Sequence, residues 1–268
     1  MTSEDASNQI LLGELTAPEI RDIGAADGSI LIIPVGSLEQ HGPHLPVATD
    51  TILAEAVSKR GATRVADEVP VVVAPGFWSG FSPHHLSLGG TASLDFEHML
   101  GSLEDLAATL LPNGFDAILF MNGHGGNSPV IGAALNTIGP KYPDVDVLGM
   151  MYFDLIAPHA EELREGEVVG THAGEIETAL IMHLRPELVR EGEMEPVEHT
   201  APMDAEGGGM FTPGVLSAYR DFETYTAIGS EGDPTVATPE KGEEVLELVG
   251  EEFATVLREI HDVNSGAD

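Results

Sequence analysis

The segment SILIIPVGSLEQHGPHLPVATD (residues 29–50) contains both the strand pattern and the polar side chains that decide the fold. Residues 29–35 form an almost continuous apolar run, which is typical of a strand buried on both faces of a parallel sheet. A Gly-Ser turn ends this run, and Glu39, His41 and Asp50 follow soon after it. Open parallel sheets bind their ligands beyond the carboxyl ends of the strands. The segment therefore predicts a buried strand with a functional site at its end.

The rest of the chain repeats this alternation of short apolar runs with helical patterns. Further strands are predicted over residues 69–74, 117–121 and 145–151, and amphipathic helices over 50–60, 95–111, 175–184 and from 238 onward. Strands that alternate with helices are the signature of βαβ units. We therefore predict an α/β fold, a three-layer α/β/α sandwich around a mainly parallel sheet. Because no internal repeat or linker divides the sequence, we expect one domain over residues 1–268.

The chain is strongly acidic, with 45 Asp and Glu against 11 Lys and Arg and a formal net charge of −34. Nucleic-acid binding requires a basic face, so this balance argues against it. The acidic residues are spread along the chain, and salt relieves their mutual repulsion by shortening the Debye length to roughly 3 Å at 1 M. We interpret the composition as that of a cytoplasmic protein from a salt-accumulating halophile of archaeal type. The alternative is an acidic protein of a mesophile.

Neither export nor membrane insertion is indicated. The N-terminal MTSEDASNQI is polar and acidic, without the basic and apolar regions of a signal peptide. The longest apolar runs, such as ILIIPV and VPVVVAP, are far shorter than the ~20 residues that span a bilayer. The absence of cysteine excludes disulfides, thiolate nucleophiles, iron–sulfur clusters and Cys-type zinc sites. Any bound metal must therefore be held by histidines and carboxylates.

Two clusters of histidines and carboxylates follow directly on predicted strands. In the first, Glu39 and His41 lie two residues apart, so their side chains point to the same side of an extended backbone. Asp50 opens the next helix and can fold back over the same place. In the second, NGHGGN, the glycines around His124 let the backbone approach a metal or substrate closely. A converging set of carboxylates and imidazoles is a ligand set for Zn²⁺ or Mn²⁺.

A third cluster, GTHAGEIET (residues 170–178), lies at the start of a predicted helix. Its His172 and Glu175 are three residues apart and can face one cavity there. In so acidic a chain a lone Glu is more often a solvated surface charge, and a lone His is more often structural. The coincidence of three clusters at strand ends or helix starts favours a functional site instead, with enough ligands for two metal ions.

Four ordered segments, PVGSLEQHGPHLPVATD, NGHGGN, GTHAGEIET and GDPTVATPEKG, resemble the creatininase (creatinine amidohydrolase) family. The resemblance extends from about Ile30 to the final helix. It implies a three-layer α/β/α fold with a dinuclear metal site, and a hydrolase of carbon–nitrogen bonds other than peptide bonds. It also implies a homo-oligomer, with a hexamer common among members.

The resemblance further implies roles for individual residues. The implied metal ligands are Glu39, Asp50 and His124 for one ion, and His41 with the bridging Asp50 for the other. In creatininase a last glutamate lies two residues after the histidine of the NGH turn, where this chain has Gly126. We therefore expect Glu175 to replace it, both as a ligand and in catalysis, and His172 to transfer protons. Four further residues are expected to orient ligands or line a substrate pocket: Glu177, Trp78, His85 and Asn127.

The expected cofactors are two divalent metal ions per chain, zinc or manganese, with iron also compatible. Creatininase closes over creatinine with tryptophans, whereas this chain has only Trp78, in a different segment. We therefore expect hydrolysis of a small cyclic amide or formamide, as by a formamide deformylase of archaeal flavin or deazaflavin biosynthesis. The alternatives are a creatinine amidohydrolase, a mycofactocin-type peptidase and a metal-binding relative without catalysis. A Rossmann-type oxidoreductase is disfavoured because no GxGxxG follows the first strand.

Overall fold

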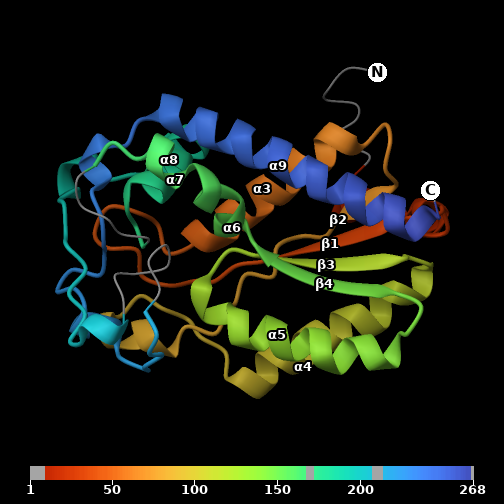
Figure 1. Cartoon of the computed structure of the whole chain (residues 1–268), viewed down its shortest axis with the longest axis horizontal. Helices are drawn as coiled ribbons and strands as arrows, with labels where there is room; N and C mark the ends of the chain where they lie inside the picture. The colour runs from red at the N-terminus through yellow and green to blue at the C-terminus, as the bar shows by residue number, and fades with distance from the viewer. Residues whose placement is uncertain (1–9, 167–171, 207–213, 267–268) are drawn as a thin grey trace.

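The computed structural model describes residues 10–166, 172–206 and 214–266 (Figure 1). A parallel sheet of four strands lies at its centre, in the order β2-β1-β3-β4. The strands are β1 (Ile30–Val35), β2 (Val71–Val73), β3 (Ala117–Asn122) and β4 (Asp146–Met151). Their ends agree with the predicted strands to within two residues.

Helices cover both faces of the sheet. They are α2 (Ala17–Gly24), α3 (Thr49–Val65), α4 (Phe96–Leu110), α5 (Ser128–Ile138), α6 (Tyr152–Ile156), α7 (Ala160–Leu163), α8 (Glu175–Leu184) and α9 (Pro239–Ser265). Helices α3, α6, α8 and α9 lie on one side, and α4 and α5 on the other (Figure 1). Short 3₁₀ helices connect them, including Pro83–Leu88, Gly125–Asn127 and Phe222–Thr224 near the site.

Strands β1, β2 and β3 are buried on both faces, as the apolar runs predict, whereas most residues of the edge strand β4 are half-buried or exposed. Ile30 and Ile32 of β1 pack in one core with α3 and α9, whereas Leu31 and Ile33 pack in a second core with α4 and α5. This division follows from the alternation of side chains across a strand. The three-layer α/β/α prediction is therefore confirmed.

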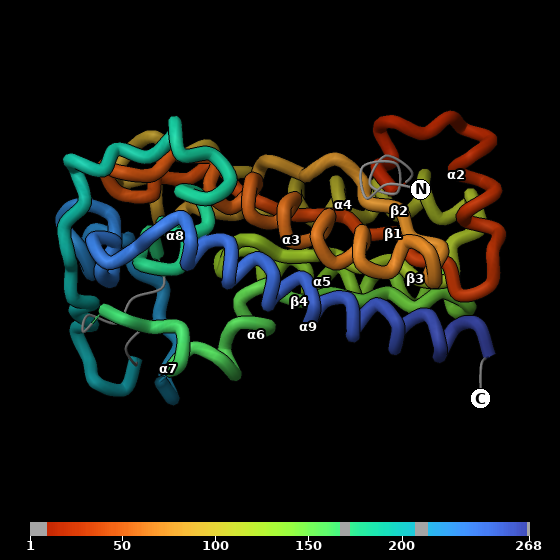
Figure 2. The backbone as a smooth tube through the Cα atoms, turned by 90° about the horizontal axis from the view of Figure 1, so that it is seen from above, coloured from red at the N-terminus to blue at the C-terminus, as the bar shows by residue number. Residues whose placement is uncertain are grey.

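Helix α9 packs against the N-terminal half of α8 and fixes its position. It begins after Thr238, whose hydroxyl accepts a hydrogen bond from the Lys241 amide at 3.1 Å. A Cβ on Gly242 would lie 2.0 Å from the Ala179 carbonyl oxygen, so glycine lets the two helices pack in backbone contact. Farther along, α9 runs beside α3 (Figure 2). This packing fixes the first turn of α8, which begins at Glu175.

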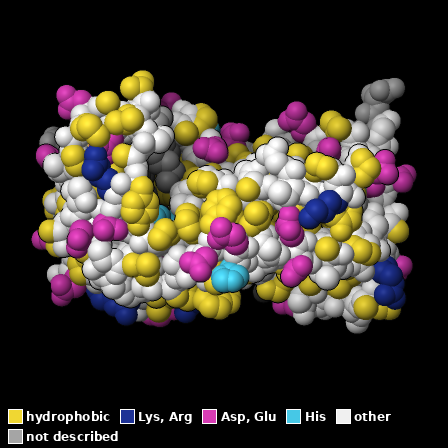
Figure 3. All heavy atoms as spheres, turned by 90° about the horizontal axis from the view of Figure 1, so that it is seen from below, with side chains coloured by type: hydrophobic (Ala, Val, Ile, Leu, Met, Phe, Trp, Pro, Cys, Tyr) yellow, Lys and Arg dark blue, Asp and Glu magenta, His cyan; other side chains and the backbone are white. Residues whose placement is uncertain are grey.

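The surface carries the acidity of the sequence in dispersed form. On the face seen in Figure 3, Asp and Glu side chains are scattered among apolar and neutral groups. Across the described residues, no helix combines the length and apolar character that crossing a membrane requires.

Candidate metal centre

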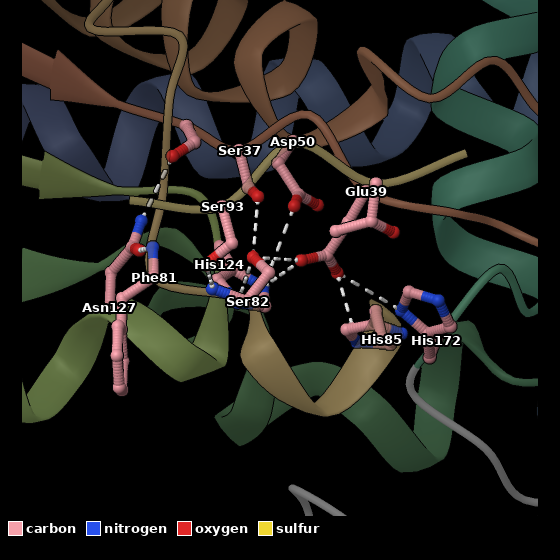
Figure 4. Close-up of polar contacts among 12 residues, drawn as sticks. Ser37, Glu39, Asp50, Phe81, Ser82, His85, Ser93, His124, Asn127 and His172 are labelled. Atoms are coloured by element: carbon pink, nitrogen blue, oxygen red, sulfur yellow. Dashed lines mark hydrogen bonds and ion pairs between the residues drawn. The ribbon is translucent and has the colours of Figure 1, made fainter. Parts of the chain in front are cut away.

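The candidate site lies beyond the carboxyl ends of β1 and β3, where three segments meet. Residues 36–50 follow β1, the NGHGGN turn follows β3, and residues 172–177 lead into α8. Side chains from all three segments, together with His85 of the 3₁₀ helix Pro83–Leu88, form three overlapping groups that could hold a metal ion. Figure 4 shows several of them converging on Glu39. The structure thus brings the three sequence clusters together.

Glu39, Asp50 and His124 form one group, with a potential ligand atom of each within 4.8 Å of the others. His124 Nδ1 lies 3.0 Å from Glu39 Oε2 and 3.5 Å from Asp50 Oδ2. All three side chains are buried. The turn after β3 fixes His124, because its backbone N–H donates to Asn122 Oδ1 at 3.0 Å. These are the residues expected to hold the first ion.

His41, His172 and Glu177 form a second group. His41 Nε2 lies 3.1 Å from Asp50 Oδ1 and 3.7 Å from Glu177 Oε1. The other nitrogen of His41, Nδ1, donates to the Glu39 carbonyl oxygen at 3.1 Å, which leaves Nε2 for the centre. Asp50 therefore presents one oxygen to each of the two groups.

Several buried atoms of this cluster lack hydrogen bonds within the described part of the chain. They are Glu39 Oε1, His41 Nε2 and Asp50 Oδ2. Buried polar atoms are normally paired, so three orphaned atoms within one cluster require an explanation. All three belong to side chains whose chemistry suits Zn²⁺ or Mn²⁺. The residues present therefore fit a divalent metal ion.

Glu175 does not take the position expected for a ligand and catalytic group. Its carboxylate contacts Lys241 Nζ and accepts hydrogen bonds from two backbone N–H groups, at 3.0 and 3.1 Å. Glu177, expected to orient ligands or line a substrate pocket, lies beside His41. Both glutamates lie in the first turn of α8. The ion pair with Lys241 holds the Glu175 carboxylate on the side of α8 that faces α9, away from His41. Tertiary packing therefore places Glu177, and not Glu175, beside the described ligand cluster.

The cluster concentrates negative charge in a dry environment. Burial, together with the Glu39 charge, raises the pKa of Asp50 to about 7. Burial also opposes the charge of Glu39, but His124 and His85 outweigh it and hold the pKa of that carboxyl well below its usual range. Likewise, burial disfavours the charge of His41, yet Asp50 and Glu177 raise its pKa well above normal. A cation would relieve the repulsion between the carboxylates.

Ser82 connects two candidate ligands, and no pattern in the sequence indicated it. Its Oγ lies 2.7 Å from Glu39 Oε2 and 3.0 Å from His124 Nε2. Ser37 Oγ lies 2.6 Å from Ser82 Oγ. A carboxylate only accepts, so Ser82 donates to Glu39 and accepts from His124 and Ser37. The hydrogen bond from His124 Nε2 to Ser82 leaves His124 Nδ1 facing Glu39 and Asp50, as a metal ligand requires.

The other expected residues have different surroundings. His85 is buried and lines the cavity over the cluster. Asn127 joins two segments behind the site, donating to the Gly36 carbonyl at 3.0 Å and accepting from the Phe81 amide at 2.8 Å. Trp78 is 56% exposed and lies in a separate apolar groove. Trp78 therefore does not line the described wall of the cavity over the cluster.

A cavity of about 560 Å³ opens onto the cluster. His84, His85, His124 and His172 line it together with Glu39. Its remaining walls include these residues of the segment between α8 and α9: Leu216, Phe222, Tyr225, Glu206 and Glu231. The lining that the structure describes includes three glutamates and neither lysine nor arginine.

Comparison with known proteins agrees with this geometry. The family model "Creatininase: Creatinine amidohydrolase" matches residues 13–257. A creatinine amidohydrolase of Pseudomonas putida is 31% identical over 268 residues, covering 94% of this chain and 98% of that protein. A mycofactocin precursor peptide peptidase of Mycobacterium ulcerans (strain Agy99) is 30% identical over 266 residues, covering 92% of each. The solved structure "Creatininase Mn" superposes with a TM-score of 0.80 at 30% identity, covering 93% of this chain and 98% of that one. This chain belongs to the creatininase family of hydrolases, whose amidohydrolases act on carbon–nitrogen bonds other than peptide bonds.

Proposed function

We propose that this chain hydrolyses the carbon–nitrogen bond of a small cyclic amide or formamide with water activated at a dinuclear metal centre. The observation that carries the proposal is the position of Asp50. One of its oxygens lies 3.1 Å from His41 Nε2, and the other lies 3.5 Å from His124 Nδ1. A carboxylate placed between two ligand groups in this way is suited to bridge two cations.

We assign Glu39, Asp50 and His124 to one cation, and His41, Asp50 and Glu177 to the other. Zn²⁺ and Mn²⁺ both suit this set, and Fe²⁺ is compatible with it. When bound, such a pair would lower the pKa of a shared water from about 15.7 toward ~7 and polarise the substrate carbonyl. The manganese named for the solved creatininase supports a divalent metal in this fold.

His172 is suited to move the proton in this reaction. Its Nε2 donates to the Gln40 carbonyl at 2.8 Å, and its Nδ1 lies 3.7 Å from Glu39 Oε1. Burial, reinforced by the charge of His41, holds the pKa of His172 well below its usual range, so the ring is neutral at the start. A neutral imidazole there can accept a proton from the attacking water and deliver it to the leaving nitrogen.

The cavity favours an uncharged substrate. No described lysine or arginine lines it, and Glu206 and Glu231 already pair with Arg220 and His199, so the described wall offers no lysine or arginine to bind a substrate carboxylate or phosphate. Phe222 packs against His85 and His172, with ring centroids 4.4 and 4.7 Å apart, and shields the floor from water. A volume of about 560 Å³ suits a small molecule. A neutral cyclic amide or formamide meets these conditions, which supports the proposed substrate class; a formamide deformylase is one enzyme of that class.

The test combines metal analysis with a substrate screen. Protein purified in molar KCl is assayed for metal per chain by mass spectrometry, as wild type and as Asp50→Asn. The panel contains formamides, lactams, creatinine and short peptides. We expect about two metals per wild-type chain, hydrolysis of a formamide or cyclic amide, and loss of both in the variant. Bound metal without any hydrolysis would favour a non-catalytic relative, and cleavage of peptides alone would favour a peptidase.

A further inference from the structure

Gln40 contacts two histidines of the cavity, His85 through its side chain and His172 through its backbone carbonyl. The side-chain Nε2 of Gln40 lies 2.8 Å from His85 Nδ1. Its backbone carbonyl oxygen lies 2.8 Å from His172 Nε2. A neutral imidazole carries its proton on either nitrogen, and the hydrogen-bond partners decide which one. Gln40 is therefore placed to decide the tautomer of both rings.

The carboxamide of Gln40 is held in one orientation by the backbone of Gly42. Its Oε1 accepts from the Gly42 backbone N–H at 3.1 Å. Because a backbone N–H only donates, this contact identifies the amide oxygen and leaves the NH₂ group facing His85. On the other side, a Cβ on Gly229 would lie 1.8 Å from Gln40 Oε1, and Gly229 has a φ of +84°. A side chain at residue 229 would therefore displace the carboxamide. The hydrogen bond from Gly42 sets which end of the amide is the oxygen, because the exchanged amide would place a donor against the Gly42 donor.

This orientation determines the tautomer of His85. The NH₂ group of Gln40 donates, so His85 Nδ1 must accept, and the ring hydrogen sits on Nε2. His85 Nε2 lies 3.3 Å from Glu39 Oε1, the oxygen of the candidate ligand that has no hydrogen bond. Figure 4 shows His85 and His172 approaching Glu39 from the same side. His85 thus presents an N–H, rather than a lone pair, to a metal-binding carboxylate.

The tautomer of His172 follows from the main chain. The Gln40 carbonyl can only accept, so His172 Nε2 must donate to it. Gln40 Nε2 lies 3.1 Å from the same His172 nitrogen, but the carbonyl contact is shorter and cannot be reversed. Nδ1 therefore carries the lone pair, on the side of Glu39.

We infer that Gln40 is a positioning residue that sets both tautomers, so that His85 offers a hydrogen to Glu39 and His172 offers a lone pair to the centre. The catalytic consequence of this arrangement rests on the proposed function, whereas the tautomers themselves do not. The side chain of Gln40 controls His85, and its backbone controls His172. A side-chain substitution should therefore change the first histidine and leave the second unchanged.

The tautomers can be read directly by NMR of the zinc-loaded protein labelled with ¹⁵N-histidine. Long-range ¹H–¹⁵N correlations distinguish Nδ1–H from Nε2–H, and His85→Asn and His172→Asn variants assign the signals. We expect Nε2–H at both His85 and His172. His261 serves as an internal reference for Nδ1–H, because its Nδ1 lies 3.0 Å from the Gly28 carbonyl oxygen. An Nδ1–H tautomer at either cavity histidine would overturn the inference, and this wild-type measurement needs no substitution at Gln40.

Two variants then separate the side chain from the backbone. Gln40→Met preserves the length and removes the donor, so His85 should lose its single tautomer while His172 keeps Nε2–H. Gln40→Glu still accepts from Gly42 but requires a hydrogen on His85 Nδ1, so the His85 tautomer should reverse. Zinc affinity should fall about 10-fold in Gln40→Met, because groups that orient metal ligands typically contribute 10–100-fold. Unchanged His85 signals in both variants would refute the role of Gln40, whether or not the wild type hydrolyses any amide.

Discussion

Exchanging Glu177 for Gln removes a carboxylate charge beside the second candidate metal while keeping the size of the side chain. Glu177 Oε1 lies 3.7 Å from His41 Nε2, and Glu177 Oε2 accepts from the Ala173 amide at 2.7 Å. A carboxamide can still accept that amide hydrogen bond, so the fold should survive. We expect bound metal to fall from about two ions per chain to about one, and turnover to fall at least about 10²-fold, the lower range for losing activated proton transfer.

Glu175→Gln is the matched control, because it makes the same chemical change two residues earlier on the same helix. Its charge lies against Lys241, which keeps a second partner in Glu165 at 2.8 Å. A hydrogen bond between charged groups contributes about 1.5–3 kcal/mol, so we expect the free energy of unfolding to fall by about 2 kcal/mol. For a chain of this size, that corresponds to a decrease in Tm of about 4–8 °C. The metal content should stay at about two.

The assay is metal analysis after gel filtration in molar KCl, together with thermal unfolding followed by circular dichroism. The assignment predicts metal loss in Glu177→Gln and stability loss in Glu175→Gln. If Glu175→Gln lost a metal ion while Glu177→Gln kept both, Glu175 would be the ligand after all and the reasoning from the Lys241 ion pair would be refuted.

Three further predictions concern the wall of the site, its pH dependence and the surface charge. Ser82→Ala should weaken zinc binding about 10–100-fold in a chelator competition, because Ser82 orients Glu39 and His124; unchanged affinity would contradict that role. In the metal-free protein, burial and the Glu39 charge raise the pKa of Asp50 to about 7, whereas in the unfolded chain it is about 3.9. Protonated Asp50 therefore stabilises the fold fully below about pH 3.9, and this stabilisation is lost as the pH rises through about 7. The stability of wild type relative to Asp50→Asn in urea should therefore decrease across that window, and a flat difference would contradict the shift. Raising KCl from about 0.1 M to about 1 M should increase Tm because it screens the net charge of −34, and a Tm that did not respond would count against the halophile interpretation.

Local sequence patterns were sufficient for the four strands and for helices α3, α4, α8 and α9, but not for α2, α6 and α7 or for the choice of ligand. Helix α8 was predicted from Glu175 to Leu184 and has those bounds. Even so, periodicity alone could not tell which glutamate of its first turn faces the metal cluster. That choice depends on Lys241, which lies 66 residues away in sequence and meets Glu175 only after α9 packs on α8. The sequence could therefore indicate the helix and the cluster, but not the side of the helix.

Small polar residues of the site carried no signal in the sequence. Ser82 and Gln40 matter because of the atoms that surround them, and nothing in their spacing distinguishes them from other serines or glutamines. Trp78 is the opposite case, since its large aromatic side chain favours a pocket position in the sequence but lies exposed in a separate groove. A single domain, cytoplasmic location and homo-oligomeric assembly stay predictions.

The two-metal bridge at Asp50 is tested most directly by anomalous X-ray diffraction from crystals of the zinc- or manganese-loaded protein. We predict two anomalous peaks about 3.5–4 Å apart, one on each side of Asp50. Glu39 and His124 should contact one peak, and His41 and Glu177 the other. A single peak, or two peaks that Asp50 does not bridge, would contradict the dinuclear centre.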